Sequence, residues 1–221
     1  MPGLGRKPAP DTRDLGYSVT KPLAAALPPV NRVLRYWNAN GWWGDQGEKP
    51  QCVGYACVHL LEDGPVTQSG KVPIVQPATL YIEAQKVDEF PGPPPAYDGT
   101  SVRAGIKALQ ARGFVEAYYW ATTTKQIIDA ILTLGPVVMG TDWLENMFEP
   151  DEAGFLDVSG RVVGGHAYLA NGVNVNAGFF RIKNSWGRSW GNSGHALLHF
   201  SDMNRLMSTQ GEAALVVERR K

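Results

Sequence analysis

The change in hydrophobic periodicity at Gly135-Pro136 constrains the fold of this chain more than any other feature. Before these residues, apolar side chains recur at the spacing of helices. After them, apolar residues form short runs separated by Gly and Asn. Helices and strands therefore occupy different halves of the sequence instead of alternating. This separation predicts an α+β fold rather than a repeated βαβ arrangement.

Three helices are expected in the first half, and each has a recognisable start. The first begins at Cys52, and the second follows Thr100 or Ser101 as its N-cap. The third begins at Thr123, whose spacing to Gln126 forms a capping box. The expected helices cover residues 52–61, 102–112 and 123–134, and the expected strands cover residues 137–139, 167–170, 179–182, 195–200 and 213–217.

Residues 1–10 are rich in Pro and Gly and carry no periodic pattern, so we expect a flexible N-terminal segment. Residues 11–221 are expected to form a single domain of two lobes. One lobe, residues 21–120, holds the predicted helices. The other lobe, residues 121–221 together with 11–20, holds the predicted strands.

Composition narrows the classes of partner that this 221-residue chain can bind. Its 43% of apolar residues can form a substantial core. Lys plus Arg and Asp plus Glu each total 21, so no net field attracts nucleic acid or an anionic membrane. The N-terminus lacks the apolar run of a secretory signal, and no stretch approaches about 18 apolar residues. We expect a cytoplasmic protein. A secretory signal trimmed from the sequence would change this expectation.

The two cysteines, Cys52 and Cys57, lie on the same predicted helix. At about 100° per residue their side chains point about 140° apart, so an intramolecular disulfide is not expected. His59 is the histidine nearest to both thiols, which leaves fewer ligands than the four of a structural zinc site. We expect no metal and no other cofactor.

Cys52 is the better candidate for a reactive thiol. A cysteine attacks as its thiolate, whereas a free thiol with a pKa of about 8.5 is mostly protonated at neutral pH. The N-terminus of a helix and a neighbouring imidazolium both favour the thiolate. Cys52 begins its helix, whereas Cys57 lies in the second turn among apolar residues, as expected for a buried and unreactive thiol.

Residues 45–56, Asp-Gln-Gly-Glu-Lys-Pro-Gln-Cys-Val-Gly-Tyr-Ala, resemble the nucleophile segment of papain-like cysteine peptidases, particularly the prokaryotic branch. In that family a Gln side chain and the backbone N–H of the nucleophile form the oxyanion hole, and Gln46 stands at the matching interval before Cys52. Gln51 precedes Cys57 by the same interval, but only the first register contains Asp-Gln-Gly and begins a helix. Lys49 occupies a position where many relatives have a disulfide cysteine.

Two later segments resemble the same family. Residues 164–168, Gly-Gly-His-Ala-Tyr, are similar to its histidine segment. Residues 182–191, Ile-Lys-Asn-Ser-Trp-Gly-Arg-Ser-Trp-Gly, match its asparagine segment almost residue for residue. His166 and Asn184 follow Cys52 in the family order, and His166 does so at a shorter interval than the roughly 130–150 residues of the family example.

The resemblance implies a papain-like fold, with the active site in a cleft between a helical left lobe and a strand-rich, β-barrel-like right lobe. It implies a cysteine peptidase that hydrolyses peptide or protein substrates through a Cys52 thioester. His166 would exchange protons with Cys52, and Asn184 would orient His166. Gln46 would donate to the oxyanion, Trp186 would cover the His–Asn hydrogen bond, and Trp190 would line the primed side of the cleft.

Small residues are expected to line the main specificity pocket, where they would accommodate a bulky apolar side chain: Ala167, Gly140 and Gly164. The other histidines are expected to be structural or to face solvent: His59, His195 and His199. Two alternatives use the same site. One is a peptide ligase or transpeptidase, in which an amine replaces water in the second step, and the other is a catalytically inactive papain-fold binding protein. The four filled catalytic positions favour an enzyme.

Overall fold

The computed structural model describes residues 1–25, 32–38, 41–68, 70–90 and 98–220. Its α-helices are α1 (Thr20–Ala25), α2 (Cys52–Asp63), α3 (Pro77–Gln85), α4 (Val102–Ala111), α5 (Thr124–Thr133) and α6 (Phe200–Ser208), and the short 3-10 helices are η1 (Thr12–Tyr17) and η2 (Glu145–Phe148). Its strands are β1 (Leu34–Tyr36), β2 (Val115–Trp120), β3 (Val137–Leu144), β4 (Val162–Asn174), β5 (Phe179–Lys183), β6 (His195–His199) and β7 (Glu212–Glu218). The elements confirm the predicted α+β class.

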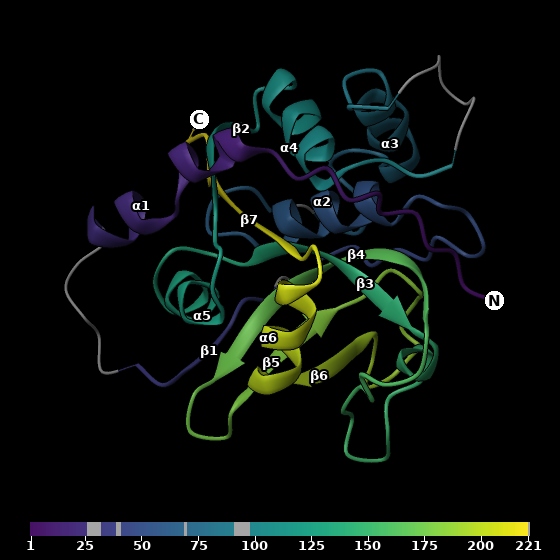
Figure 1. Ribbon diagram of the computed structural model, residues 1–221. Coiled ribbons are helices and arrows are strands. Elements are labelled where there is room, and N and C mark those ends of the chain that lie inside the picture. The colour runs from purple at the N-terminus through teal and green to yellow at the C-terminus, as the bar shows by residue number, and fades with distance from the viewer. Residues whose placement is uncertain (26–31, 39–40, 69, 91–97, 221) are drawn as a thin grey trace.

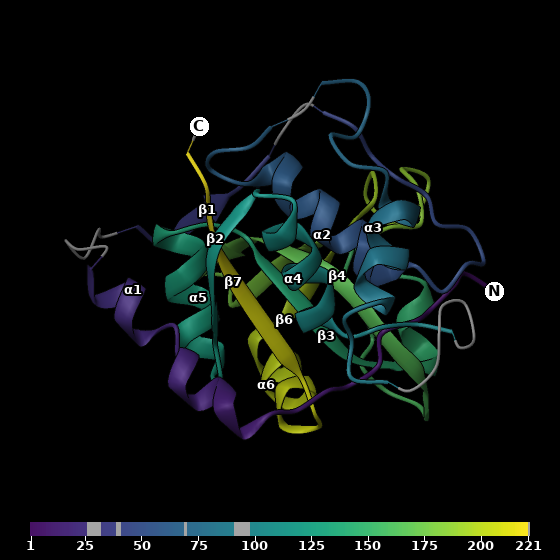
Figure 2. The same cartoon turned by 90° about the horizontal axis from the view of Figure 1, so that it is seen from above.

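These strands form one seven-stranded sheet in the order β2-β7-β3-β4-β5-β6, with β1 paired to β4. Every pairing is antiparallel. Helices α2, α3 and α4 cover one face of the sheet, whereas α5 and α6 cover the other (Figures 1 and 2). The molecule therefore has two apolar cores, one on each face of the sheet.

Alternation along β3 and β4 divides the side chains between the two cores. Val138 and Leu169 pair across the strands and belong to the helical core. Their neighbours Met139 and Tyr168 also pair and belong to the opposite core. Successive side chains of a strand point to opposite faces, which accounts for this division. Ala167 lies on the helical side, so β4 brings the residue that follows His166 into the core with α2.

Two glycines fix α2 between its neighbouring helices. A methyl group added at Gly54 of α2 would lie 2.4 Å from the carbonyl oxygen of Pro77, at the start of α3. A methyl group added at Gly105 of α4 would lie 2.8 Å from the Cys57 sulfur in α2. The helices approach this closely because neither position carries a side chain. Since α2 also contacts β3 and β4, its position relative to the sheet is set from several sides.

Residues 1–10, where the sequence predicts a flexible segment, contact the body of the protein in this structure. Arg6 forms a parallel bridge with Thr100, and the Gly3 N–H donates to the Gly47 carbonyl at 2.7 Å. In Figure 1 this purple segment runs from the N-terminus across the junction between the helical layer and strands β3 and β4. A methyl group added at Gly3 would lie 2.2 Å from the Lys49 carbonyl oxygen. Gly here permits close contact with the protein body, whereas the sequence reasoning treated it as a sign of mobility.

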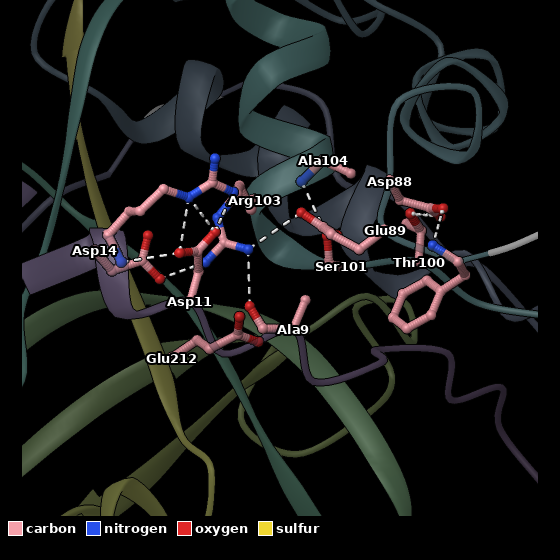
Figure 3. A network of polar contacts seen from close by, with 12 residues as sticks. Ala9, Asp11, Asp14, Asp88, Glu89, Thr100, Ser101, Arg103, Ala104 and Glu212 are labelled. Carbon is pink, nitrogen blue, oxygen red and sulfur yellow. Dashed lines mark hydrogen bonds and ion pairs between the residues drawn. The ribbon is translucent and has the colours of Figure 1, made fainter.

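Arg103 of α4 binds the end of this segment and the residues that follow it (Figure 3). Its Nη1 donates to the Ala9 carbonyl at 2.8 Å and to Glu89 Oε1 at 3.1 Å, and its Nη2 pairs with Asp14. Only 4% of Arg103 is exposed, so these pairs are poorly screened by solvent. The N-terminal segment is therefore anchored to α4 immediately downstream of Arg6.

The structure confirms the three predicted helices as α2, α4 and α5 and the five predicted strands as β3 to β7. Helices α1, α3 and α6 and strands β1 and β2 were not predicted from the sequence. Because β1 pairs with β4 and β2 pairs with β7, the sheet includes strands from residues 21–120, which were expected to form the helical lobe. Among the described segments, no helix combines the length and apolar character needed to cross a membrane.

Gly54→Ala is expected to lower the free energy of unfolding by about 1–2 kcal/mol. The added methyl group would overlap the Pro77 carbonyl oxygen at 2.4 Å. Such overpacking costs about 1–3 kcal/mol, of which the better helix propensity of Ala recovers up to about 1 kcal/mol. Urea unfolding measures the change. Gly70→Ala is the matched control, because nothing lies within 4 Å of its added methyl group. Equal unfolding midpoints for both variants would contradict the close α2–α3 contact.

Candidate active site

Cys52 is the first residue of α2 and is completely buried. The preceding N-cap residue, Gln51, makes no side-chain capping hydrogen bond, so the first turn keeps free backbone N–H groups. Backbone hydrogen bonding from Ala167 and Val53 favours the thiolate of Cys52. The thiol therefore lies where the start of α2 meets β4. The β4 residue that it meets there, Ala167, follows His166 in the sequence.

His166 lies on β4 and is oriented by Asn184. The His166 Nε2 and Asn184 Oδ1 atoms are 2.8 Å apart. The Ser185 backbone N–H donates to the same Oδ1 at 2.8 Å, which identifies this atom as the amide oxygen and Nε2 as the protonated ring nitrogen. The other ring nitrogen, Nδ1, is buried and has no hydrogen-bond partner within the described residues. Nδ1 is thus free to accept a proton.

Aromatic rings enclose the His166 imidazole. The ring of Trp143 packs edge-on against it with centroids 4.7 Å apart, and the ring of Trp186 lies 4.8 Å away. Burial among these rings lowers the pKa of His166 to about 4, although the hydrogen bond to Asn184 acts in the opposite direction. The imidazole is therefore neutral at neutral pH in this structure.

Gln46 reaches the same site from the loop before α2. Its backbone N–H donates to the Ser185 carbonyl at 2.8 Å, and the Ser185 hydroxyl donates to Gln46 Oε1 at 2.5 Å. These two bonds leave the Nε2 amide group of Gln46 free to donate to other groups. It donates to the carbonyl oxygens of Gly3 at 2.9 Å and Lys49 at 2.6 Å. Ser185 thus links the position of Gln46 to that of its neighbour Asn184.

The N-terminal segment covers this group of residues. Besides Gln46, the Trp186 indole N–H points to the Gly3 carbonyl oxygen, at 3.3 Å. Farther along the segment, the backbone N–H groups of Gly5 and Arg6 both donate to the Gly165 carbonyl at 3.0 Å. A carbonyl of the chain's own backbone therefore lies at the Gln46 amide, and the segment continues beside His166.

Burial determines the charge state of the thiol. It raises the pKa of Cys52 to about 12, despite the backbone groups and the nearby positive charge of Arg6, which lower it. Together with the low pKa of His166, this keeps the thiol and imidazole neutral while the cleft is covered.

The other predicted residues lie at varying distances from this group. Gly164 and Gly140 contact the N-terminal segment, since added methyl groups would lie 2.7 Å from Leu4 and 3.0 Å from Arg6. Ala167 is buried in the helical core. Trp190 packs edge-on against Trp186 and donates its indole N–H to the Phe148 carbonyl at 2.6 Å.

The remaining Cys and His residues lie apart from the His–Asn pair. Cys57 is buried in the helical core, and both cysteines are free thiols, as the sequence predicts. His59 and His195 pack against Trp43, and His199 stacks on Phe155 at 4.2 Å.

Sequence reasoning missed three contributors to the site. Ser185 stands in the quoted asparagine segment, but only the structure reveals its bond to Gln46. Trp143 comes from β3 and reaches His166 through strand pairing, which no local pattern indicates. The N-terminal segment escaped notice because its contacts lie at the far end of the chain. The Gly residues at positions 3 and 5, which allow it to fit, were its only local signal.

Comparison with known proteins agrees with this fold. A model of the papain family of cysteine proteases matches residues 88–213, more than half of the chain. The chain therefore belongs to the papain family. It is 30% identical over 200 residues to an uncharacterized peptidase C1-like protein, L477, of Acanthamoeba polyphaga mimivirus. The match covers 68% of this chain and 62% of the viral protein.

Two solved structures share the fold. Xylellain, a cysteine protease from Xylella fastidiosa, superposes with a TM-score of 0.75 at 20% identity, covering 99% of this chain and 97% of xylellain. Digestive procathepsin L 3 from the larval midgut of Tenebrio molitor gives a TM-score of 0.63 at 17% identity, covering 97% of this chain and 83% of the other. These likenesses establish the predicted papain-like α+β fold.

The buried neutral state of His166 is expected to make stability depend on pH. An unfolded histidine has a pKa near 6.5, whereas burial lowers the pKa of His166 to about 4. As the pH falls, His166 is therefore protonated in the unfolded chain before it is protonated in the folded protein. The stability contributed by the neutral ring is lost as the pH drops from about 6.5 to about 4, by about 3 kcal/mol in total. Ring titration by NMR and urea unfolding across this range measure both quantities.

His166→Gln is the comparison that isolates this effect, because other buried histidines also contribute to the pH dependence. The variant is expected to lose less stability than the native protein over the same interval. Parallel stability curves, or a His166 ring that titrates near pH 6.5, would contradict the buried neutral state.

Proposed function

We propose that this protein hydrolyses peptide bonds, with Cys52 as nucleophile, His166 as proton acceptor and donor, and Asn184 as the residue that orients His166. The observation that supports it best is the hydrogen bond from Gln46 Nε2 to the Gly3 carbonyl oxygen, at 2.9 Å. A peptide carbonyl is thus bound by the proposed oxyanion donor.

In the first half of the reaction, Cys52 Sγ attacks the substrate carbonyl carbon, and the thiol proton moves to His166 Nδ1. The carbonyl oxygen becomes an oxyanion, which Gln46 Nε2 and the Cys52 backbone N–H stabilise as donors. His166 then gives its proton to the nitrogen of the departing amine as the C–N bond breaks. A thioester between the acyl part of the substrate and Cys52 remains.

In the second half, water attacks the thioester carbonyl carbon while His166 Nδ1 accepts a proton from that water. The same donors stabilise the second oxyanion. The C–S bond breaks, the carboxylic acid leaves, and the proton returns from His166 to the sulfur. Throughout, the bond between His166 Nε2 and Asn184 holds the ring, and the surrounding Trp143 and Trp186 rings shield that bond from water.

Substrate can reach Cys52 only after the N-terminal segment moves, because the thiol is 0% exposed in this structure. Displacement would also rehydrate the thiol and imidazole. Burial is the main cause of the raised pKa of Cys52 and of the lowered pKa of His166, so both values should move toward those that favour a thiolate–imidazolium pair. Opening of the cleft would thus expose the nucleophile and activate it.

Replacing each cysteine separately tests the nucleophile. Cys52→Ala is expected to abolish peptide hydrolysis, because no thioester can form. Cys57→Ala is expected to retain hydrolysis and to lower stability by about 0.5–3 kcal/mol, as is usual for a change in a packed core. Cleavage of fluorogenic peptides and urea unfolding measure the two effects.

An epoxysuccinyl inhibitor provides the matched chemical test, with the labelled peptide identified by mass spectrometry. Label on Cys52 alone is the expected result. The decisive comparison is between the folded protein with its segment displaced and the denatured protein. If Cys52 resists the inhibitor in the first but is alkylated normally in the second, the proposed role of this thiol is refuted.

Gly3→Val is expected to displace the covering segment and speed alkylation of Cys52 by iodoacetamide. The new side chain cannot fit, since even a methyl group would lie 2.2 Å from the Lys49 carbonyl oxygen. Each unit by which the pKa of Cys52 then falls raises the thiolate fraction about tenfold at a given pH. Alkylation rates at Cys52 between pH 6 and 8 are the measurement.

Gly16→Val is the control for this variant, because nothing lies within 4 Å of a methyl group added there. It should leave the alkylation rate unchanged. If Gly3→Val also leaves that rate unchanged at every pH, the segment does not limit access to the thiol.

A further inference from the structure

Arg6 lies on the segment that covers the candidate active site, and its side chain is completely inside the protein. The exposed fraction of that side chain is 0%, and its Nη2 lies 2.8 Å from Glu212 Oε2. Its Nε donates to the same oxygen at 2.9 Å, and its Nη2 also donates to the Gln210 carbonyl. A cationic side chain from an extended segment thus fills a closed site that ends in a carboxylate.

The site lies where β4, β3 and β7 run side by side. The strand register places Gly140 opposite both Ala167 and Glu212. A methyl group added at Gly140 would lie 2.7 Å from Val102 and 3.0 Å from Arg6 Nε, so the missing side chain provides the room. Gly140, which was expected to line a specificity pocket, therefore lies beside an inserted side chain. That side chain is a guanidinium, whereas the sequence analysis expected an apolar group.

The backbone around Arg6 is bound in the manner of a peptide ligand. The Thr100 N–H donates to the Gly5 carbonyl and the Lys7 N–H donates to the Thr100 carbonyl, both at 2.9 Å. On the other side, the Arg6 N–H donates to the Gly165 carbonyl at 3.0 Å. Main-chain bonds of this kind hold extended peptides of many sequences, whereas side-chain pockets select among them. A substrate that displaced the segment would place one of its own side chains in this pocket.

The chemistry of Glu212 limits which side chain the pocket accepts. Burial raises the pKa of this carboxyl group, and the positive charge of Arg6 lowers it. An apolar occupant would leave the buried carboxylate unpaired, which is unfavourable. A guanidinium can pair with the carboxylate and also donate to the Gln210 carbonyl, whereas the single ammonium of a lysine lacks this planar fork. Gln210 adopts a left-handed φ of 71°, which is uncommon for a residue with a side chain.

We propose that Glu212 makes this site a specificity pocket for an arginine side chain located close to the scissile bond of a peptide substrate. Arg6 occupies the pocket as a ligand supplied by the chain itself. This inference rests on the proposed hydrolytic function and adds to it the class of substrate. It also identifies a specificity residue that lies outside the segments resembling the family's catalytic motifs.

The test uses the full chain carrying Arg6→Ala, which empties the pocket. The values of kcat/KM are measured for peptides that carry Arg, Lys, Leu or Phe in turn at each of three residues beside the scissile bond. At one of these positions Arg is expected to be preferred to the other three. Adding Glu212→Gln is expected to lower the Arg-to-Leu ratio roughly 10- to 100-fold, the usual effect of losing a hydrogen bond to a charged group.

Glu218→Gln is the matched control, because Glu218 is also a buried glutamate of β7 and accepts the Thr67 N–H at 2.6 Å, away from Arg6. It should leave the Arg-to-Leu ratio unchanged. If Glu212→Gln fails to fold, Gly140→Ala tests the same pocket without removing a charge. Its methyl group narrows the pocket, so hydrolysis of the Arg peptide should fall more than hydrolysis of a peptide with Gly at that position.

The possible failures are distinguishable. Cleavage of peptides with no preference for Arg, or an Arg preference that both Glu212→Gln and Gly140→Ala leave intact, would overturn the pocket assignment while the hydrolytic function stands. Absence of cleavage of every peptide by a folded Arg6→Ala protein whose Cys52 is alkylated by iodoacetamide, and is therefore accessible, would overturn the proposed function itself.

Discussion

Packing of the first turn of α2 against β4 is the contact on which the rest of the candidate site depends. Cys52 and Ala167 are fully buried in the same core cluster, so the thiol is held beside the strand that carries His166. A second connection forms where Asp45 bridges to Trp186 and the Gln46 N–H binds the Ser185 carbonyl. The two connections bring the Gln46 amide, a thiol and an imidazole together from distant parts of the chain. The positions of these groups thus follow from the packing of the helical layer on the sheet.

Burial both builds the site and restrains its chemistry. The rings around His166 protect its bond to Asn184, but the same exclusion of water disfavours the imidazolium and the thiolate. The covering segment completes this dry environment and brings polar groups that hydrogen-bond to its walls, among them the Gly3 carbonyl and the Arg6 guanidinium. The covered site is therefore a stable arrangement of neutral reacting groups. Exchange of the segment for a peptide would preserve most of the wall contacts while altering the hydration of the thiol.

Local patterns in the sequence were sufficient for the helices with clear caps. Ser101 accepts the Ala104 N–H and Thr123 accepts the Gln126 N–H, as their positions indicated. The papain-like fold could be expected because three matching segments occur in family order. Contacts between distant segments were different, since hydrophobic periodicity carries no information about which residues meet. Trp143 reaches His166 through strand register, and Arg6 reaches Glu212 across almost the whole chain. The apolar pocket expected from Gly140 and Ala167 failed to anticipate a charged occupant, because the carboxylate comes from a third strand.

The proposed hydrolysis requires that Cys52 carries the acyl group. Its most direct test is rapid acid quenching of the Gly3→Val protein with a peptide ester, followed by mass spectrometry of the protein and its proteolytic fragments. A transient mass increase equal to the acyl group is expected on the fragment that contains Cys52, and it should appear and decay at rates consistent with turnover. Hydrolysis of the ester with no acyl group on Cys52 at any time, or with the group on another residue, would contradict it.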